Sequence, residues 1–320
     1  MSFARDAKCE VLESKIENEC CLLAFLSAVI HSCGELTKRG KEIFVELKTD
    51  IPSLLEQVND CLSTLYGTKA TMHKDTFSNI AKNERYVIEL PKDVTNRILF
   101  DCGIVRFNLD DDFSLNTGLD DHVIENDCCV KSYVKGVFVT SSTSNITLDS
   151  EGKKRMSSGY HWEFVFTHEE FATDFSNILF SLGLSNKKNK RKNLHILYIK
   201  EAEKISDLLA SVGAFRSLLK LQSEMTFREV RNNINRQNNC ISANITKTVN
   251  ASVKQINAIN KIKNSVGLDY LSKDLQEVCT LRLEHPEESL EELTKLSSGK
   301  LTKSGMNHRL NKILKIAEKL

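Results

Sequence analysis

The chain has 320 residues, of which 41% are hydrophobic and 27% are charged, and its net charge is +1. This composition is typical of a globular protein with two hydrophobic cores, and it excludes a disordered polyion. The sequence contains no apolar run of the roughly twenty residues that a membrane span needs, and no signal-peptide segment follows Met1. We therefore expect a cytoplasmic protein without membrane contacts.

Two similar stretches indicate an internal duplication. They are residues 19–34 (ECCLLAFLSAVIHSCG) and 127–142 (DCCVKSYVKGVFVTSS), and both are predicted helices. In each stretch an acidic residue precedes two adjacent cysteines. Thirteen positions after the first cysteine of each pair stand Cys33 and Ser141.

The segments after each helix repeat as well. Apolar residues with a period of two predict the first strand of each repeat, and apolar residues at helical spacing predict the helix after it. A further strand and a closing helix that ends in glycine complete each repeat. In the first repeat the predicted elements are strand 42–49, helix 51–66, strand 85–90 and closing helix 96–103. In the second repeat they are strand 160–167, helix 169–182, strand 193–199 and closing helix 205–213. We therefore predict an α+β domain over residues 1–222, made of two α-β-α-β-α repeats at about 1–110 and 120–222.

The repeats resemble the LAGLIDADG homing endonucleases. In that fold two motif helices pack on a pseudo-two-fold axis, and the strands form a saddle over DNA. The nine-residue motif corresponds to residues 26–34 (LSAVIHSCG) and 134–142 (VKGVFVTSS). The small residues Ser27, Ala28 and Gly136 would allow the two helix backbones to approach closely.

The resemblance also locates the catalytic acids of that family, and both positions are vacated here. Active members place an acid before the last residue of each motif, where two carboxylates share divalent metal ions. The corresponding residues are Cys33 and Ser141, and neither replaces the carboxylate that hard cations prefer. Glu35 and Asp127 are the nearest acids, but they lie outside the required positions. We therefore predict no catalytic residue, no metal and no cofactor, with an active homing endonuclease as the alternative.

Cysteine and histidine patterns agree with that prediction. The chain has ten cysteines but no C-x-x-C pair, and the adjacent pairs Cys20-Cys21 and Cys128-Cys129 lie in apolar helices. We expect reduced, buried thiols rather than zinc ligands or disulfides. Four histidines lack a metal-binding spacing and are expected to pack or to lie at the surface: His31, His161, His195 and His285.

Motifs along nearly the whole chain resemble the WhiA family of bacterial regulators. They are YIKE at 198–201, ISDLL at 205–209, NR at 235–236 and, most specifically, KSGMNHRL at 303–310. The chain departs from the family pattern at 139–142 (VTSS) and in a polar hairpin expected over 145–158. The resemblance implies a non-enzymatic DNA-binding regulator at the nucleoid, with roles in transcription, cell division and chromosome segregation, and in sporulation in some relatives. A scaffold that binds a protein or ligand partner is the remaining alternative.

Two segments between the motifs carry further predictions. A helical linker over 223–242 is expected to lead into a C-terminal domain over 243–320. Residues 228–266 contain no Gly or Pro and keep apolar residues at helical intervals, so we expect two successive helices there. The basic run 187–192 (KKNKRK) is predicted to be a solvated turn, with a strand edge that contacts nucleic acid as the alternative.

Positive charge is concentrated near the C-terminal end. Residues 228–320 contain sixteen basic and ten acidic side chains, a net charge of +6, and the first 227 residues carry −5. Residues 300–320 alone hold six basic side chains and one acid. An anionic partner is therefore expected at this end of the chain, and double-stranded DNA is the partner that the resemblance implies.

The same region shows the element order of a helix-turn-helix. Pro286 is expected to end one helix, Ser289 and Glu292 form a predicted capping box for a short second helix, and a third helix follows. The N-terminal part of the last helix of this motif enters the major groove. Base contacts are predicted for Asn307, His308 and Arg309. The full set of predicted DNA-binding residues is Lys300, Thr302, Lys303, Ser304, Asn307, His308, Arg309, Lys312 and Lys315.

Overall fold

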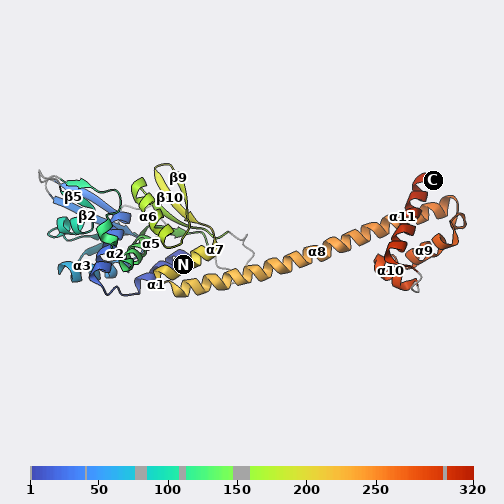
Figure 1. Ribbon diagram of the computed structural model, residues 1–320, viewed down its shortest axis with the longest axis horizontal. Helices are drawn as coiled ribbons and strands as arrows, with labels where there is room; N and C mark the ends of the chain where they lie inside the picture. Colours follow the sequence, from blue (N-terminus) through green and yellow to red (C-terminus); the bar gives the residue numbers. More distant parts are fainter. Residues whose placement is uncertain (1, 40–41, 76–84, 108–112, 147–158, 298–300) are drawn as a thin grey trace. The chain divides into compact units, whose positions relative to one another are not determined.

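The chain forms two compact units, Met1–Phe227 and Arg228–Leu320. The structure, a computed structural model, describes residues 2–39, 42–75, 85–107, 113–146, 159–297 and 301–320 (Figure 1). Most of the polar hairpin predicted over 145–158 lies outside these described residues, and so does Lys300.

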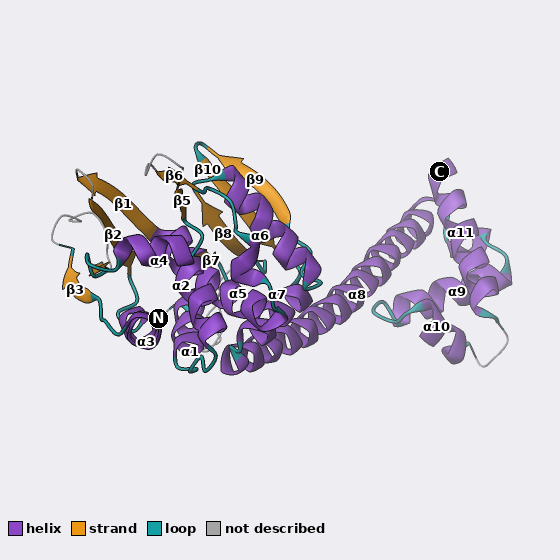
Figure 2. Ribbon diagram, turned by 60° about the vertical axis from the view of Figure 1, so that its left-hand side comes forward, coloured by secondary structure: helices purple, strands orange, loops and turns teal. Residues whose placement is uncertain are grey.

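The first unit contains two repeats of one element order (Figure 2). After α1 (Phe3–Leu12), the first repeat consists of α2 (Glu19–Cys33), β1 (Gly34–Arg39), β2 (Glu42–Thr49), α3 (Leu54–Tyr66), β3 (Thr71–Lys74), β4 (Tyr86–Glu89) and α4 (Thr95–Asp101). The second repeat consists of α5 (Asp127–Ser141), β7 (Ser142–Ser144), β8 (Trp162–Phe166), α6 (Glu169–Ser181), β9 (Lys187–Arg191), β10 (Leu194–Ile199) and α7 (Ala202–Val212). The connection between them holds β5 (Val105–Phe107), β6 (Phe113–Leu115) and the 3-10 turn η1 (Asp121–Ile124).

Each repeat carries a four-stranded antiparallel sheet, with strand orders β1-β2-β4-β3 and β7-β8-β10-β9. The matching orders confirm the duplication. The predicted α-β-α-β-α pattern was wrong in one respect, because each repeat has four strands rather than two. The strands that the sequence did not show are β1, β3, β7 and β9, which form the edges of the sheets. Edge strands are short or charged, so they lack the apolar alternation that predicts a strand.

The basic run 187–192 is part of this correction. Residues 187–191 form β9, every side chain of which is exposed, and Lys192 adopts a left-handed conformation with φ of 55° in the turn to β10. The prediction of a solvated turn was therefore wrong for most of the run. Lysines are suited to an edge strand, because their charge opposes pairing with a further strand.

The motif helices α2 and α5 lie side by side at the centre of the first unit (Figures 1 and 2). A Cβ atom at Gly136 would lie 2.6 Å from the Cβ of Ala28 and 2.8 Å from the carbonyl oxygen of Phe25. The Ser132 hydroxyl donates a 2.6 Å hydrogen bond to the carbonyl of Cys21 across the pair. These contacts confirm the predicted close approach of the two helices.

His31 of α2 joins the two repeats. Its ring stacks on Phe171 of α6 with centroids 4.5 Å apart. Its Nε2 lies 3.1 Å from the carbonyl oxygen of Asn116, so Nε2 carries the proton, and the Tyr133 hydroxyl lies 3.4 Å from Nδ1. Burial lowers the pKa of His31 to about 4. The predicted packing role of this histidine is confirmed.

The second unit is helical. Its elements are most of α8 (Phe215–Ser265), the 3-10 turn η2 (Leu268–Tyr270), α9 (Lys273–Glu284), α10 (Leu290–Leu296) and α11 (Lys303–Lys319). The helix α8 is continuous, so the prediction of two helices over 228–266 was wrong. Its first interruption is Gly267, which has a φ of 80°. None of the described helices is long and apolar enough to cross a membrane.

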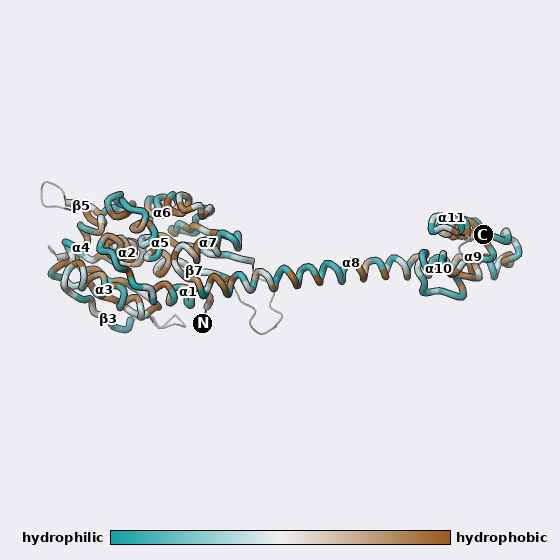
Figure 3. The backbone as a smooth tube through the Cα atoms, turned by 60° about the horizontal axis from the view of Figure 1, so that its bottom comes forward, coloured by the Kyte–Doolittle hydropathy of each residue, from teal (hydrophilic) through white to brown (hydrophobic). Residues whose placement is uncertain are grey.

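Apolar residues recur along α8 (Figure 3), although they are about half exposed. Their spacing explains the helical prediction, and the absence of Gly and Pro explains why the helix has no break. The half-exposed residues are Val230, Ile234, Ile241, Ile245, Val249 and Val253.

The close contact between α2 and α5 predicts a large cost for added volume at Gly136. We expect Gly136→Leu to lower the free energy of unfolding by at least about 1–3 kcal/mol, because the leucine must push the Ala28 side chain and the Phe25 backbone away. Gly159→Leu is the matched control, since a Cβ there has no atom within 4 Å. Equal melting temperatures for the two variants would contradict the tight helix pair.

The buried His31 predicts a pH-dependent stability. Because its folded-state pKa of about 4 lies below the ordinary 6.5, the unfolded state binds more protons between these values. The contribution is present above about pH 6.5 and is lost as the pH falls toward 4, by on the order of 3 kcal/mol. We expect His31→Gln to flatten the dependence of the unfolding free energy on pH in this window, as measured by denaturant unfolding between pH 4 and 7.

Candidate nucleic-acid interface

The last three helices enclose a small core of their own. The apolar stripe predicted for the third helix is inward in the structure, since Met306, Leu310, Ile313 and Ala317 are buried and Leu314 is partly buried. These residues meet buried side chains of α8, α9 and α10, namely Ile259, Ile262, Leu275, Val278, Cys279 and Leu293. The core fixes which face of α11 remains available to a ligand.

The turn between α9 and α10 is held by hydrogen bonds. Ser289 and Glu292 form the predicted capping box, with distances of 2.9 Å and 3.3 Å. Arg282 is only 2% exposed, and it donates to the carbonyl oxygens of His285 at 3.3 Å and Glu288 at 2.8 Å. The sequence did not indicate this role, because an arginine on a polar helix is normally exposed.

The start of α11 presents polar side chains to solvent. Thr302 is the N-cap, and its side chain accepts a 3.1 Å hydrogen bond from the backbone of Gly305. Ser304, His308 and Lys312 recur at intervals of four residues, which places them along one face of the helix. The exposed members of the predicted DNA-binding set are Thr302, Lys303, Ser304, Asn307, His308, Lys312 and Lys315.

Two basic residues of the set have acidic neighbours that the sequence analysis did not include. The Arg309 side chain is 27% exposed, and its guanidinium donates a 3.1 Å hydrogen bond to Asp274 of α9. The Lys303 ammonium lies 3.5 Å from Glu291 of α10. Both partners are far away in sequence, so helical periodicity within α11 does not reveal them. The availability of both side chains to DNA therefore depends on an ion pair with a neighbouring helix, and Arg309 is the less exposed of the two.

In the first unit the two vacated acid positions close the motif helices. Cys33 is the last residue of α2, and its thiol donates a 3.2 Å hydrogen bond to the carbonyl of Val29. Burial raises the pKa of this thiol to about 12. The buried Lys8 of α1 interacts electrostatically with Cys33. Ser141 is the last residue of α5, so the two ends of the motif helices carry a neutral thiol and a hydroxyl.

The nearest acids are placed elsewhere. Glu35 lies on β1, where its carboxylate is 2.6 Å from the ammonium of Lys48. Asp127 is the first residue of α5 and therefore lies at the opposite end of that helix from Ser141. Neither acid occupies the position that a shared metal site requires.

These geometries define a class of protein with a LAGLIDADG-like unit, whose motif helices end without acids, followed by a helix-turn-helix unit. Family models agree over most of the chain. They are the WhiA N-terminal LAGLIDADG-like domain over residues 19–105, the WhiA LAGLIDADG-like domain over 130–231 and the WhiA C-terminal HTH domain over 234–317. The chain belongs to the WhiA family.

Individual relatives support this assignment. The "Probable cell division protein WhiA" of Clostridium botulinum strain Hall is 36% identical, over 100% of this chain and 99% of the relative. The protein of the same name from Clostridium acetobutylicum is 37% identical, over 100% and 98%. The solved structure of full-length DUF199/WhiA from Thermotoga maritima has 22% identity and a TM-score of 0.56, and the match covers 100% of this chain and 99% of that one. At 22% identity, this structural similarity shows that the two proteins share a fold.

Proposed function

We propose that this chain is a non-enzymatic, DNA-binding regulator that acts in cell division. The observation that carries the proposal is the exposed polar face at the start of α11, which is the last helix of the helix-turn-helix. A net charge of +6 over residues 228–320 favours a polyanionic partner. The names of the relatives, probable cell division proteins, supply the process. Roles in transcription and chromosome segregation, and a location at the nucleoid, extend this proposal through the family resemblance.

The proposed contacts divide α11 by residue type. Asn307 and His308 are exposed near the start of the helix and would hydrogen-bond to base edges in the major groove. Lys312 and Lys315 lie farther along and would contact phosphates. Arg309 has five N–H donors, so it can keep Asp274 while it donates to DNA or exchange that partner for a guanine.

The first unit contributes no cleavage in this proposal. A two-metal nuclease needs carboxylates at the ends of both motif helices, and Cys33 and Ser141 stand there instead. Lys8, whose pKa is lowered by burial, interacts electrostatically with Asp50 and Cys33, and in its charged form it disfavours a cation at that end. The proposal includes a LAGLIDADG-like domain over residues 1–222, a helical linker over 223–242 and a helix-turn-helix domain over 243–320.

A binding scaffold is the second candidate for the first unit. A cleft of about 570 Å³ lies beside α2 and α4, and it contains Arg97 and Arg106. Their guanidinium groups are paired with Asp101 at 3.6 Å and Asp120 at 3.2 Å. The lining also includes Glu19, so its three carboxylates outnumber its two guanidinium groups, which disfavours an anionic ligand.

Salt-dependent binding tests the phosphate contacts. On a fixed duplex, we expect Lys312→Ala in the full chain to lower the slope of log affinity against log salt by about 0.9, the value for one phosphate. Lys319→Ala, at the far end of the same helix, is the matched control and should leave the slope unchanged. If both variants behave alike, α11 does not approach DNA in the proposed orientation.

Sequence preference tests Arg309. If the guanidinium reads a guanine, Arg309→Ala costs roughly 1–3 kcal/mol on the preferred site and reduces the preference between sites. Asp274→Asn should preserve that preference, because it removes only the competing carboxylate. An equal loss on all duplexes for Arg309→Ala would make Arg309 a phosphate contact.

Nuclease assays test the non-enzymatic part of the proposal. We expect supercoiled plasmid to remain intact with the full chain and Mg²⁺ or Mn²⁺, because no carboxylate stands at either vacated position. The measurement is the fraction of nicked and linear plasmid on a gel. Metal-dependent nicking that is lost in Glu35→Gln would establish the alternative of an active homing endonuclease.

A further inference from the structure

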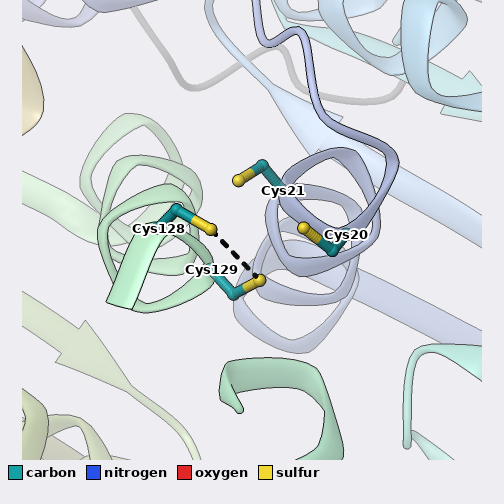
Figure 4. A group of neighbouring side chains, drawn as sticks. All are labelled: Cys20, Cys21, Cys128 and Cys129. Carbon is teal, nitrogen blue, oxygen red and sulfur yellow. Dashed lines mark hydrogen bonds between the residues drawn. The ribbon is translucent and has the colours of Figure 1, made fainter. Parts of the chain in front are cut away.

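Four cysteines from the two repeats meet at one end of the motif-helix pair. Cys20 and Cys21 lie in the first turn of α2, and Cys128 and Cys129 lie in the first turn of α5. Figure 4 shows their sulfur atoms turned toward the space between the two helices. All four sulfur atoms lie within 4.8 Å of one another, and those of Cys128 and Cys129 are 4.0 Å apart.

We propose that this four-thiol cluster binds one thiophilic cation of the zinc type, with one sulfur ligand from each cysteine. A tetrahedral zinc ion has Zn–S distances of about 2.3 Å, which separates its sulfur ligands by roughly 3.8 Å. Shifts of the sulfur atoms by about an ångström or less therefore convert the cluster into a tetrahedral site. All four cysteines are free, so every sulfur can serve as a ligand.

The helix ends supply a favourable charge environment. The unpaired N–H groups in the first turn of a helix carry partial positive charge and stabilise a thiolate. Asn18 and Asn126 are the N-caps of α2 and α5, and in the described chain neither side chain makes a capping hydrogen bond. The ammonium of Lys135 also interacts electrostatically with Cys21. The same first turns also hold Glu19 and Asp127, so the favourable contributions come from the helix ends, Lys135 and the doubly charged cation itself.

The accessibility and the rigidity of the four cysteines suit a bound ion. Cys20 and Cys128 are exposed, whereas Cys21 and Cys129 are buried, so the ion would enter from solvent and then rest on two fixed ligands. The Ser132 hydroxyl bonds the Cys21 carbonyl at 2.6 Å and holds the two helices in register beside the cluster. A bound cation would tie the first turns of both repeats together at this point.

Disulfides are the competing chemistry of the same atoms. A disulfide needs two sulfur atoms at about 2.05 Å, whereas all four cysteines are free. The four sulfur atoms here instead form one compact group. Two exposed thiols held near two buried ones match a single cation better than two covalent bridges.

Cobalt binding to the full chain tests the proposal. Protein reduced and dialysed against chelator under anaerobic conditions is titrated with Co²⁺, which reports its ligands by its absorption. We expect one Co²⁺ per chain, a thiolate-to-cobalt charge-transfer band, and the strong visible d–d bands of tetrahedral cobalt. One equivalent of Zn²⁺ should remove these bands and raise the melting temperature.

Variants assign the ligands. The pair Cys20→Ser and Cys128→Ser changes only exposed side chains, so the fold is retained, and we expect the affinity for Co²⁺ to fall at least tenfold. Cys21→Ser with Cys129→Ser should do the same, with circular dichroism as the check on folding. Cys240→Ser, at an exposed cysteine on α8, is the matched control and should bind as the unaltered chain does.

Several results would overturn the proposal. They are the absence of stoichiometric binding, a spectrum with fewer than four thiolate ligands, and retention of binding in the Cys20 and Cys128 double variant. Alkylation of free thiols at cell lysis followed by mass measurement provides the remaining test. If the cluster is then found as disulfides, the four thiols are redox partners and not a cation site.

Discussion

The contact between α2 and α5 organises the first unit, because each motif helix buries its small residues against the other. Gly136 leaves no room for a side chain beside Ala28 and Phe25, and the core on both sides of this contact is continuous through Phe25, Tyr133 and Phe138. The two sheets pack against opposite members of the pair, so their spacing follows from the approach of the helices. A close helix contact of this kind tolerates little change in side-chain volume. The positions of both sheets therefore depend on it.

Much of this architecture could be predicted, and the failures have physical causes. The central strands β2 and β8 show apolar alternation, and β4 and β10 carry short runs of buried apolar residues, whereas the edge strands carry charge and polar residues and gave no signal. The cysteine cluster was hidden for another reason. Each pair was visible as a repeated sequence, but only the pseudo-two-fold packing of α2 on α5 brings Cys20 and Cys21 to Cys128 and Cys129. A duplication that repeats cysteines at equivalent positions near its pseudo-two-fold axis therefore predicts that these cysteines lie together.

The second unit illustrates what periodicity captures within one helix. The inward residues of α11 follow from spacing alone, and so does the exposure of Asn307, His308 and Lys312. The partners of Arg309 and Lys303 come from α9 and α10, and a pattern read along one helix contains no information about them. Arg282 was missed because its buried guanidinium bonds two backbone carbonyls of a turn, a role that depends on the path of the chain after Pro286.

Lys8 bears on what a carboxylate at the first vacated position would meet. Burial lowers the pKa of Lys8, and Asp50 is its strongest electrostatic partner, followed by Cys33. A carboxylate introduced at position 33 would therefore compete with Asp50 for the ammonium of Lys8, and it would be drawn into an ion pair before it could serve as a metal ligand. Removing one partner from a buried ion pair costs about 3–5 kcal/mol. A metal site with two carboxylates thus needs changes at both Cys33 and Ser141, and the charges around Lys8 constrain the first of these changes.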